Sequence, residues 1–307
     1  MKIRINEVSP RDGLQSQGKT LSVESRLSLI QALVKAGLEN VEAGSFVSPK
    51  AVPQMAGTDE LFARLPDRNK VRYAGLVPNM KGYELAVAAG VNVVNVVLSV
   101  TETMNQKNIC MSLPQTVEVC TAIIERGGRE GVEVQVYLAV AFECPFEGLV
   151  EPAVVARFAK LVKQAGASKI IIADTIGAAN PEHVRRLLDA VTSEVGSDIL
   201  SCHFHDTRGM ALANITVAVN HGVREFDSSI GGLGGCPFSP GATGNVATED
   251  VMLLLNSMGH DTGIDPLDLI LVVSLAEKLT GVSLGGKSFR WLNQQLSKAA
   301  AETGHGG

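Results

Sequence analysis

Eight short runs, most of them with β-branched residues, recur along the chain, and a helical pattern follows each of them. The expected strands cover residues 3–8, 40–44, 71–77, 93–98, 133–140, 169–173, 200–205 and 225–228. The expected helices between them cover residues 22–36, 59–65, 81–89, 114–126, 152–164, 181–194 and 210–221. Strands that alternate with helices form parallel sheets, because each helix returns the chain to the start of the next strand. Eight such units predict an α/β protein with a single (β/α)8 TIM barrel.

An open, doubly wound sheet is the alternative for such an alternating chain. It is disfavoured because no Gly-x-Gly-x-x-Gly follows the first expected strand. After the eighth strand, residues 246–257, 266–280 and 288–301 form additional C-terminal helices, which we expect to cover the barrel or to mediate oligomerisation. We expect one catalytic domain over residues 1–301 and a disordered polar tail over residues 302–307.

Composition narrows the class of protein. The 307 residues are 45% hydrophobic and only 4% aromatic, with a net charge of -5 and dispersed Lys and Arg, so neither a nucleic-acid surface nor a polybasic membrane patch is indicated. No apolar run approaches the ~20 residues that span a bilayer. The five cysteines are odd in number and include no Cys-x-x-Cys pair, which favours reduced thiols. We therefore expect a soluble cytoplasmic protein that binds neither nucleic acid nor membranes.

Two histidines stand at the end of the seventh expected strand, in the segment LSCHFHDTRG at residues 200–209. Side chains two residues apart on a strand share a face, so His203 and His205 can bind one metal ion. The alternative is one core histidine and one surface histidine. The polar pair that follows, Asp206 and Thr207, is expected to cap a helix beginning near Met210.

Other polar residues fall at the same end of the expected barrel, where such folds keep their active sites. They are Arg11, Asp12 and Gln15 after the first strand, Glu42 and Ser45 at the second, Asp174 after the sixth, and Asn245 and Glu249 after the eighth. Each alone has a plainer explanation as a turn, a helix cap or a surface charge. Their position at one rim is what indicates a site.

Asp12, His203, His205 and Asn245 together offer one carboxylate, two imidazoles and one amide oxygen. A mixed nitrogen and oxygen set suits a divalent cation such as Mg²⁺ or Mn²⁺ and leaves positions for water and substrate. The sequence therefore predicts a metal site with these four ligands.

The glycine run at residues 231–235 ends in Cys236. The run is either a flexible surface turn or a mobile rim loop, since glycines permit positive φ and close backbone approach. A thiol at the end of a mobile loop can be brought to a substrate as a proton donor or acceptor, which favours the second interpretation. The remaining thiols are expected to be structural; they are Cys110, Cys120, Cys144 and Cys202.

These motifs resemble the hydroxymethylglutaryl-CoA lyase family of metal-dependent TIM-barrel lyases. The matching segments are SPRDGLQ (9–15), EAGSFVSPK (42–50), VPQM (52–55), DTIG (174–177), HFHDT (203–207), SSIGGLGGCP (228–237) and GNVATED (244–250). Order and spacing agree from Ile5 to about Gly263. Condensing relatives share the Arg-Asp and His-x-His elements but usually carry a long C-terminal extension.

The resemblance implies a role for each site residue. Asp12, His203, His205 and Asn245 would hold the divalent cation. Arg11 would stabilise the enolate, Glu42 would orient this centre, and Cys236 would act with His203 in acid–base catalysis, with either able to shuttle the protons. Substrate contacts are expected from Arg11, Gln15, Ser45, Asp174 and Glu249. The resemblance also implies a retro-Claisen cleavage of an acyl-CoA to acetyl-CoA and a keto acid, and a homodimer or higher homo-oligomer.

The chain departs from the family pattern around the expected acyl pocket. Ser9 replaces a Gly, Ser16-Gln17-Gly18 replaces Asn-Glu-Lys, and Phe142-Glu143 replaces Leu-Gly. Ala51 replaces a Trp, Arg208 a Tyr and Phe238 a Tyr. None of these positions belongs to the metal set. We hypothesise that Ala51 and Arg208 accommodate a different or larger 3-hydroxyacyl-CoA than 3-hydroxy-3-methylglutaryl-CoA.

Two other functions remain as alternatives. A condensing synthase would join acetyl-CoA to a 2-keto acid and release free CoA, which a thiol-release assay detects. A non-catalytic barrel would bind acyl-CoA as a sensor and would bind metal without cleaving any thioester.

Overall fold

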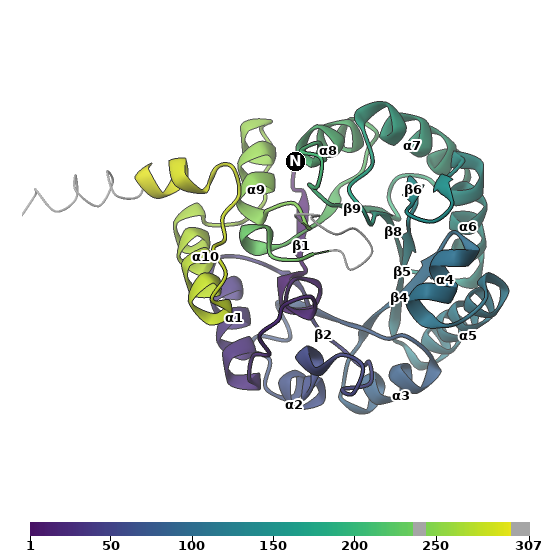
Figure 1. Cartoon of the computed structure of the whole chain (residues 1–307), viewed down its shortest axis with the longest axis horizontal. Helices are drawn as coiled ribbons and strands as arrows, with labels where there is room; N and C mark the ends of the chain where they lie inside the picture. Colours follow the sequence, from purple (N-terminus) through teal and green to yellow (C-terminus); the bar gives the residue numbers. More distant parts are fainter. Residues whose placement is uncertain (236–243, 296–307) are drawn as a thin grey trace, which may run out of the picture.

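The computed structural model describes residues 1–235 and 244–295, and its parallel strands close into a barrel ringed by helices (Figure 1). The barrel strands are β1 (Arg4–Glu7), β2 (Asn40–Ser45), β3 (Arg72–Leu76), β4 (Val93–Ser99), β5 (Glu133–Ala139), β8 (Lys169–Asp174), β9 (Leu200–Phe204) and β10 (Glu225–Ser228). They follow chain order around the barrel, and β10 pairs with β1 to close it. The predicted (β/α)8 barrel is confirmed, and every strand end lies within one residue of its expected position.

The helices begin and end where the sequence supplies caps. They are α1 (Val23–Lys35), α2 (Thr58–Ala63), α3 (Met80–Ala88), α4 (Glu102–Ile109), α5 (Leu113–Glu130), α6 (Pro152–Ala165), α7 (Pro181–Val195), α8 (Ala211–Asn220), α9 (Thr248–Ser257) and α10 (Pro266–Thr280). The side chains of Ser22 and Asn180 accept backbone N–H groups at the starts of α1 and α7. Proline begins α6 and α7, where its missing N–H costs no hydrogen bond. Asp206 contributes to the start of α8, since its carboxylate accepts the N–H of Ala211 at 3.0 Å.

Three features were not expected from the sequence. Helix α4 has a largely polar sequence with no apolar stripe, and the hairpin of β6 (Glu143–Cys144) and β7 (Gly148–Leu149) is too short to give a strand pattern. Helix α5 continues past its predicted end at residue 126 to Glu130. The helix ends instead at its left-handed C-cap, Gly131. Gly127 lies where the helix approaches β5 closely, since a Cβ there would lie 2.4 Å from the Val134 side chain. Short helical turns also occur at η1 (Ser9–Gly13), η2 (Pro53–Met55) and η3 (Ile230–Gly232).

The inside and the outside of the barrel differ in polarity. The large apolar core lies between the strands and the surrounding helices, whereas the inner apolar cluster is small, with Tyr137, Ile171, Ala173 and the partly buried Val97. Buried polar side chains occupy much of the interior, among them Glu42, Asn95, Gln135, His203 and Asp227. Each of these groups needs a partner, because an unpaired buried polar group is costly. The interior therefore carries a hydrogen-bond network that reaches the carboxyl ends of the strands.

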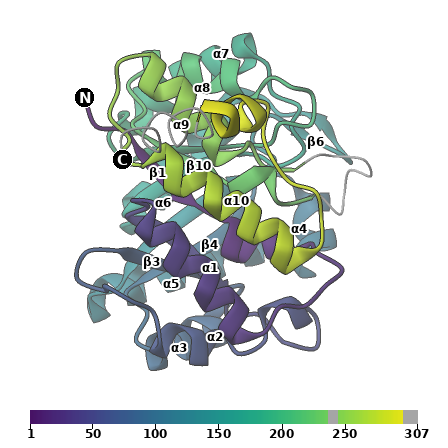
Figure 2. The same ribbon diagram turned by 90° about the vertical axis from the view of Figure 1, so that its left-hand side faces the viewer.

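The C-terminal helices cover one side of the barrel. Helix α10 lies along α1 (Figure 2), and Lys35 and Asp268 form an ion pair between them at 2.8 Å. A further helical segment occupies residues 289–295. The expected disordered tail at residues 302–307 lies outside the described residues. Within the described part of the chain, no helix is both long and apolar enough to cross a bilayer.

Candidate active site

Three predicted metal ligands converge at the carboxyl end of the barrel. Asp12 lies in η1, directly after β1, while His203 and His205 lie at the end of β9. The two imidazole rings face the same side of the strand with centroids 5.1 Å apart. One ligand atom from each of the three residues lies within 4.8 Å of the other two. The interpretation of His-x-His as one core and one surface histidine is wrong, because both side chains are buried and adjacent.

Asn245, the fourth predicted ligand, lies in the same cluster. It forms an antiparallel bridge with His205. Its amide nitrogen donates to Asp12 Oδ2 at 2.8 Å and to the carbonyl of Leu233 at 3.4 Å. The fold thus brings together four residues from the two ends of the barrel sequence.

The charge state of the cluster suits a cation. Burial, together with the neighbouring His203, lowers the pKa of His205 to about 3, so its imidazole is neutral at physiological pH. Burial acts to raise the pKa of Asp12, but Arg11 and the two histidines lower it to about 2, so its carboxylate is ionised. His205 Nδ1 is buried without a hydrogen-bond partner. The neutral imidazole of His205, whose Nδ1 has no other partner, and the ionised carboxylate of Asp12 fit a divalent cation, as the sequence predicts.

Asp227 holds His203 in place. Asp227 Oδ2 lies 3.1 Å from His203 Nδ1 and accepts the Tyr137 hydroxyl at 2.7 Å, while Oδ1 accepts Asn6 Nδ2 at 3.0 Å. Burial alone would lower the pKa of His203, but this hydrogen bond and the charge of Asp227 raise it. With Nδ1 directed at Asp227, the Nε2 atom of His203 is the nitrogen left for a metal.

Sequence reasoning did not identify Asp227 or Tyr137. The signal for Asp227 was present, because Glu225 and Asp227 are acidic residues at alternate positions of an expected barrel strand, and all four residues of β10 are buried. Tyr137 gave no such signal, since an aromatic residue in an apolar strand is the ordinary case.

Arg11 is fixed beside the cluster by two carboxylates. Its Nε donates to Glu42 Oε2 and its Nη1 to Asp12 Oδ1, each at 2.6 Å. Asn95 Nδ2 donates to the other oxygen of Glu42 at 2.7 Å. Burial acts to lower the pKa of Arg11, but Glu42 and Asp12 raise it, so a buried positive charge is held at a defined place.

Glu249 accepts a hydrogen bond from the first residue of the glycine run, Gly231. It is fully buried, and its carboxylate accepts the N–H groups of Gly231 at 3.0 Å and Gly286 at 2.6 Å. Burial raises its pKa to about 7. Glu7 acts in the same way, with Oε1 accepting the N–H of Ile230 at 3.0 Å. These contacts suit a positioning role for Glu249, and its expected contact with substrate stays a prediction.

The other predicted substrate-binding residues lie near the same rim. Asp174 ends β8 and accepts the N–H groups of Ala178 at 2.8 Å and Ala179 at 3.1 Å, and burial raises its pKa to about 6. The Ser45 hydroxyl at the end of β2 donates to the carbonyl of Leu76 at 3.3 Å. Gln15 Oε1 is buried without a hydrogen-bond partner.

Cys236 lies outside the described residues, as does the departure at Phe238. Among the other thiols, Cys120, Cys144 and Cys202 are buried, as expected of structural residues. Cys110 is exposed and ends α4 in the left-handed conformation, with φ of 55°, so its expected structural role stays a prediction.

Two of the sequence departures interact with each other. Arg208 Nη2 lies 3.6 Å from Glu143 Oε1, and Arg208 Nη1 donates to the Ala178 carbonyl at 3.4 Å. This pair joins the loop after β5 to the loop after β9. Ala51 and Gly18 are both exposed.

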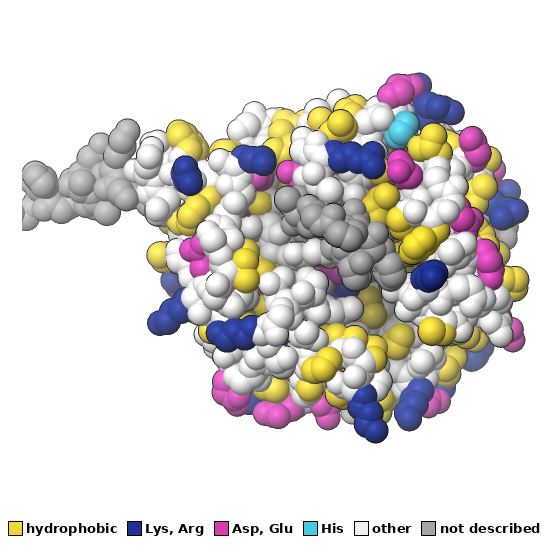
Figure 3. Space-filling model, in the orientation of Figure 1, with side chains coloured by type: hydrophobic (Ala, Val, Ile, Leu, Met, Phe, Trp, Pro, Cys, Tyr) yellow, Lys and Arg dark blue, Asp and Glu magenta, His cyan; other side chains and the backbone are white. Residues whose placement is uncertain are grey.

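The face drawn in Figure 3 carries side chains of both charges. In Figure 3, Lys and Arg side chains are scattered around the visible face and alternate with acidic ones. No single basic patch gathers on the described part of that face.

Comparison with known proteins supports the resemblance. The HMGL-like family model matches residues 2–275. The 3-hydroxy-3-isohexenylglutaryl-CoA/hydroxymethylglutaryl-CoA lyase of Pseudomonas aeruginosa is 45% identical over 298 residues, which cover 97% of this chain and 98% of the relative. The hydroxymethylglutaryl-CoA lyase of Pseudomonas mevalonii is 44% identical over 263 residues, covering 86% and 87%.

Solved structures agree with this match. A crystal structure of hydroxymethylglutaryl-CoA lyase from Pseudomonas aeruginosa superposes with a TM-score of 0.92 at 42% identity, over 96% of this chain and 98% of that one. Carboxyl transferase domains of Rhizobium etli pyruvate carboxylase, at 17% identity and a TM-score of 0.68, share the fold alone. The chain therefore belongs to the HMGL-like family of carbon–carbon lyases.

Proposed function

We propose that this enzyme cleaves 3-hydroxy-3-methylglutaryl-CoA, or a close 3-hydroxyacyl-CoA, to acetyl-CoA and the matching keto acid, which is acetoacetate in the first case. The observation that carries the proposal is the cluster of Asp12, His203 and His205 beside the buried cation of Arg11. The names of its relatives point to the same acyl-CoA class.

Asp12, His203 and His205 would hold a divalent cation, with Asn245 as the fourth protein ligand. When bound, Mg²⁺ or Mn²⁺ supplies Lewis acidity that polarises substrate oxygens and lowers the pKa of the substrate hydroxyl. The donor set of imidazole, carboxylate and amide accepts either ion. Measuring turnover after removal and replacement of the metal tests which ion is used.

Arg11 is the residue best placed to stabilise developing negative charge. Carbon–carbon cleavage leaves an acetyl-CoA enolate, whose oxygen needs a fixed positive partner. Glu42 and Asp12 each accept a 2.6 Å hydrogen bond from the guanidinium, so its orientation is set before substrate arrives. Such a group need not reorganise during the reaction, which is what makes electrostatic stabilisation effective.

Proton transfer is assigned to His203 and Cys236. Asp227 contacts Nδ1 of His203 and leaves Nε2 for the cation, so a proton transferred by His203 would pass through Nδ1 and Asp227. Cys236 would approach on the glycine-rich loop, whose root is held by Glu249 through Gly231. Which of the two residues carries each proton is decided by comparing the pH–rate profiles of single variants.

A longer acyl branch is the second candidate substrate. The Pseudomonas aeruginosa relative is named for both isohexenylglutaryl-CoA and hydroxymethylglutaryl-CoA. In this chain, Ala51 stands where the family pattern has Trp, and Arg208 where it has Tyr. Loss of two aromatic rings near the mouth favours a larger substituent at carbon 3 of the substrate.

The decisive experiment is incubation with Mg²⁺ or Mn²⁺ and a panel of 3-hydroxyacyl-CoAs that differ in the carbon 3 substituent. Acetyl-CoA and the matching keto acid are the expected products. A parallel thiol-release assay with acetyl-CoA and 2-keto acids tests the synthase alternative, since only a synthase frees CoA. Metal binding without cleavage of any thioester would refute the lyase proposal and favour the sensor.

We also propose a homodimer or higher homo-oligomer in the cytoplasm. Light scattering of the purified chain tests the oligomeric state, and fractionation of cells tests the location.

A further inference from the structure

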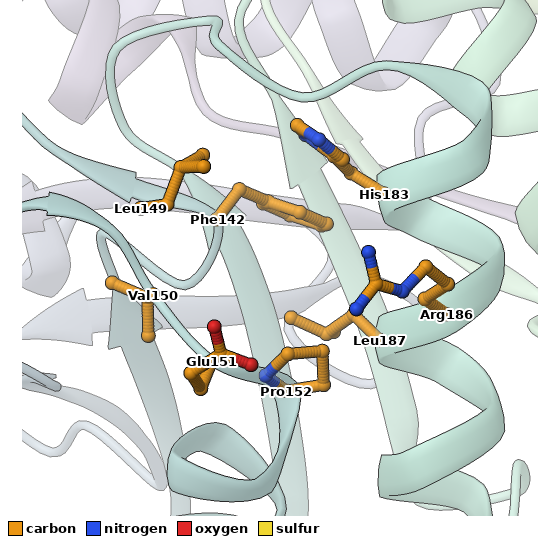
Figure 4. Close-up of a pocket in the computed structure, with 8 residues that line it drawn as sticks. All are labelled: Phe142, Leu149, Val150, Glu151, Pro152, His183, Arg186 and Leu187. Carbon is orange, nitrogen blue, oxygen red and sulfur yellow. The ribbon is translucent and has the colours of Figure 1, made fainter.

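A cleft lies at the rim of the barrel, and its lining includes none of the metal-cluster residues. It has about 400 Å³ of open space between the β6–β7 hairpin and the first turns of α7 (Figure 4). Its lining includes Phe142, Val150, Glu151, His183, Arg186 and Leu187. Small-molecule sites combine an apolar wall with a few convergent polar groups, and the lining of this cleft has both.

The apolar wall is rigid. Phe142 and Leu187 are 4% and 1% exposed, so neither side chain is free to move away. The N–H of Val150 donates to the Phe142 carbonyl at 3.0 Å and fixes the base of the hairpin. A preformed wall lowers the entropic cost of binding.

Two opposite charges face this wall from different elements. Arg186 comes from α7, whereas Glu151 is the residue directly before α6, and Figure 4 shows both heads directed toward the cleft. In the described part of the chain, the two heads do not form an ion pair with each other. His183, Arg186 and Leu187 are three and four residues apart, so the helix presents them on one face. Arg185 points elsewhere, since it bonds Glu182 and Asp189 on its own helix.

We propose that this cleft binds a small zwitterion with an apolar side chain, of the chemical class of the aliphatic α-amino acids. Arg186 would bind the carboxylate, with His183 as a neighbouring donor. Glu151 would accept the ammonium group. The side chain of the ligand would pack on Phe142, Val150 and Leu187.

The charges favour this class over its neighbours. A simple anion would satisfy Arg186 but leave Glu151 facing a like charge, and a simple cation would have the reverse fault. A neutral apolar molecule would contact the apolar wall but would engage neither charged head. Only a ligand with both charges and an apolar part meets every group that lines the cleft.

The cleft adjoins the metal-bearing strand. The Phe142 ring lies 6.1 Å from the ring of Phe204, the residue between the two histidines. The next residue, Glu143, pairs with Arg208 in the loop after β9. Val140, at the start of this segment, has φ of 52°, which is strained for a β-branched residue. A ligand packed on Phe142 therefore contacts a segment that is held against the active-site rim.

Isothermal titration of the metal-saturated full chain tests the proposal with L-leucine as probe. Two matched analogues carry one charge each: 4-methylpentanoate has no ammonium group and 3-methylbutylamine has no carboxylate. We expect saturable binding of L-leucine and at least tenfold weaker binding of both analogues. Glycine, which lacks the apolar part, should also bind at least tenfold more weakly.

Variants separate the cleft from the rest of the surface. Arg186→Gln and Glu151→Gln should each lower the affinity for L-leucine at least tenfold. Arg185→Gln is the matched control and should leave it unchanged. Thermal unfolding of each variant shows that the fold is intact. The absence of saturable binding, equal affinity for the single-charge analogues, or equal loss in Arg185→Gln would overturn the proposal. None of these outcomes depends on the lyase activity.

Discussion

Replacement of Asp227 by Asn tests whether the carboxylate behind His203 sets metal affinity. The carboxylate is 2% exposed and accepts three hydrogen bonds, from His203, Tyr137 and Asn6. An amide of the same shape keeps one acceptor oxygen and turns the other position into a donor. Whichever way it is oriented, its NH₂ then faces another donor, either at Asn6 or at Tyr137 and His203.

The expected loss follows from these contacts. Groups that hold a metal-binding histidine typically contribute about 10–100-fold in metal affinity. That range corresponds to about 1.4–2.8 kcal/mol, in line with one charge-assisted hydrogen bond. Tyr137→Phe is the matched control, because it removes one donor to Asp227 and leaves the carboxylate in contact with His203. We expect it to change metal affinity less than about threefold.

The effect should depend on pH in a defined direction. Asp227 raises the pKa of His203, so in the parent protein protons compete with the metal as the pH falls through that raised value. Asp227→Asn removes this competition along with the hydrogen bond. The loss of affinity should therefore be larger near about pH 8 than near about pH 6. Titration calorimetry with Mn²⁺ measures both, and a folded Asp227→Asn variant with parental affinity at the higher pH would refute the reasoning.

Three further predictions concern other parts of the site. His205→Ala should abolish metal binding, because it removes a buried neutral ligand. Cys236→Ser should keep metal binding and slow turnover sharply. A metal affinity that calorimetry finds unchanged in His205→Ala would contradict the ligand set. Arg208→Tyr and Glu143→Gly form a double-mutant cycle on KM. The coupling free energy should be at most about 1 kcal/mol, since the two side chains are partly exposed and 3.6 Å apart. Zero coupling across the acyl-CoA panel would show that this pair does not shape the entrance to the active site. Burial raises the pKa of Glu249 from 4.5 to about 7, so between these pH values the folded protein keeps a proton that the unfolded chain loses. The free energy of unfolding should therefore fall as the pH rises across that window, by up to about 1.4 kcal/mol per pH unit. Glu249→Gln should have a shallower slope in urea titrations at several pH values, with the part that Asp174 contributes remaining, and an identical slope in both proteins would exclude Glu249 as a source.

The barrel could be predicted from sequence because its signals are local. Strands such as β4 and β8 are runs rich in β-branched residues, and the caps of α1, α6 and α7 are residues with fixed conformational preferences. Helix α4 was missed for the same reason, since its polar sequence has no periodic apolar face. The β6–β7 hairpin depends on contacts with the rim rather than on its own sequence.

The contacts behind the site residues could not be predicted in this way. Asp227 and His203 are register partners on neighbouring strands, and the sequence of either strand does not state that register. The Glu143–Arg208 pair is similar: both positions were visible as departures, but their contact depends on how two loops pack over β8 and β9. The sequence shows that Glu143 and Arg208 depart from the family pattern, but only the fold shows that they contact each other.

For Glu249, the role expected from its motif differs from the contacts that the structure gives it. Its motif places it among residues expected to handle substrate, yet both oxygens accept backbone N–H groups, from Gly231 on one side and Gly286 on the other. A buried carboxylate that accepts two such bonds has few directions left for a ligand. Through Gly231, however, it sets the start of the segment that leads to Cys236. A residue can therefore be essential to turnover without touching the substrate, and activity measurements alone would not separate the two roles. A Glu249→Gln variant with unchanged KM and reduced kcat would favour loop positioning, because direct substrate contact should alter both.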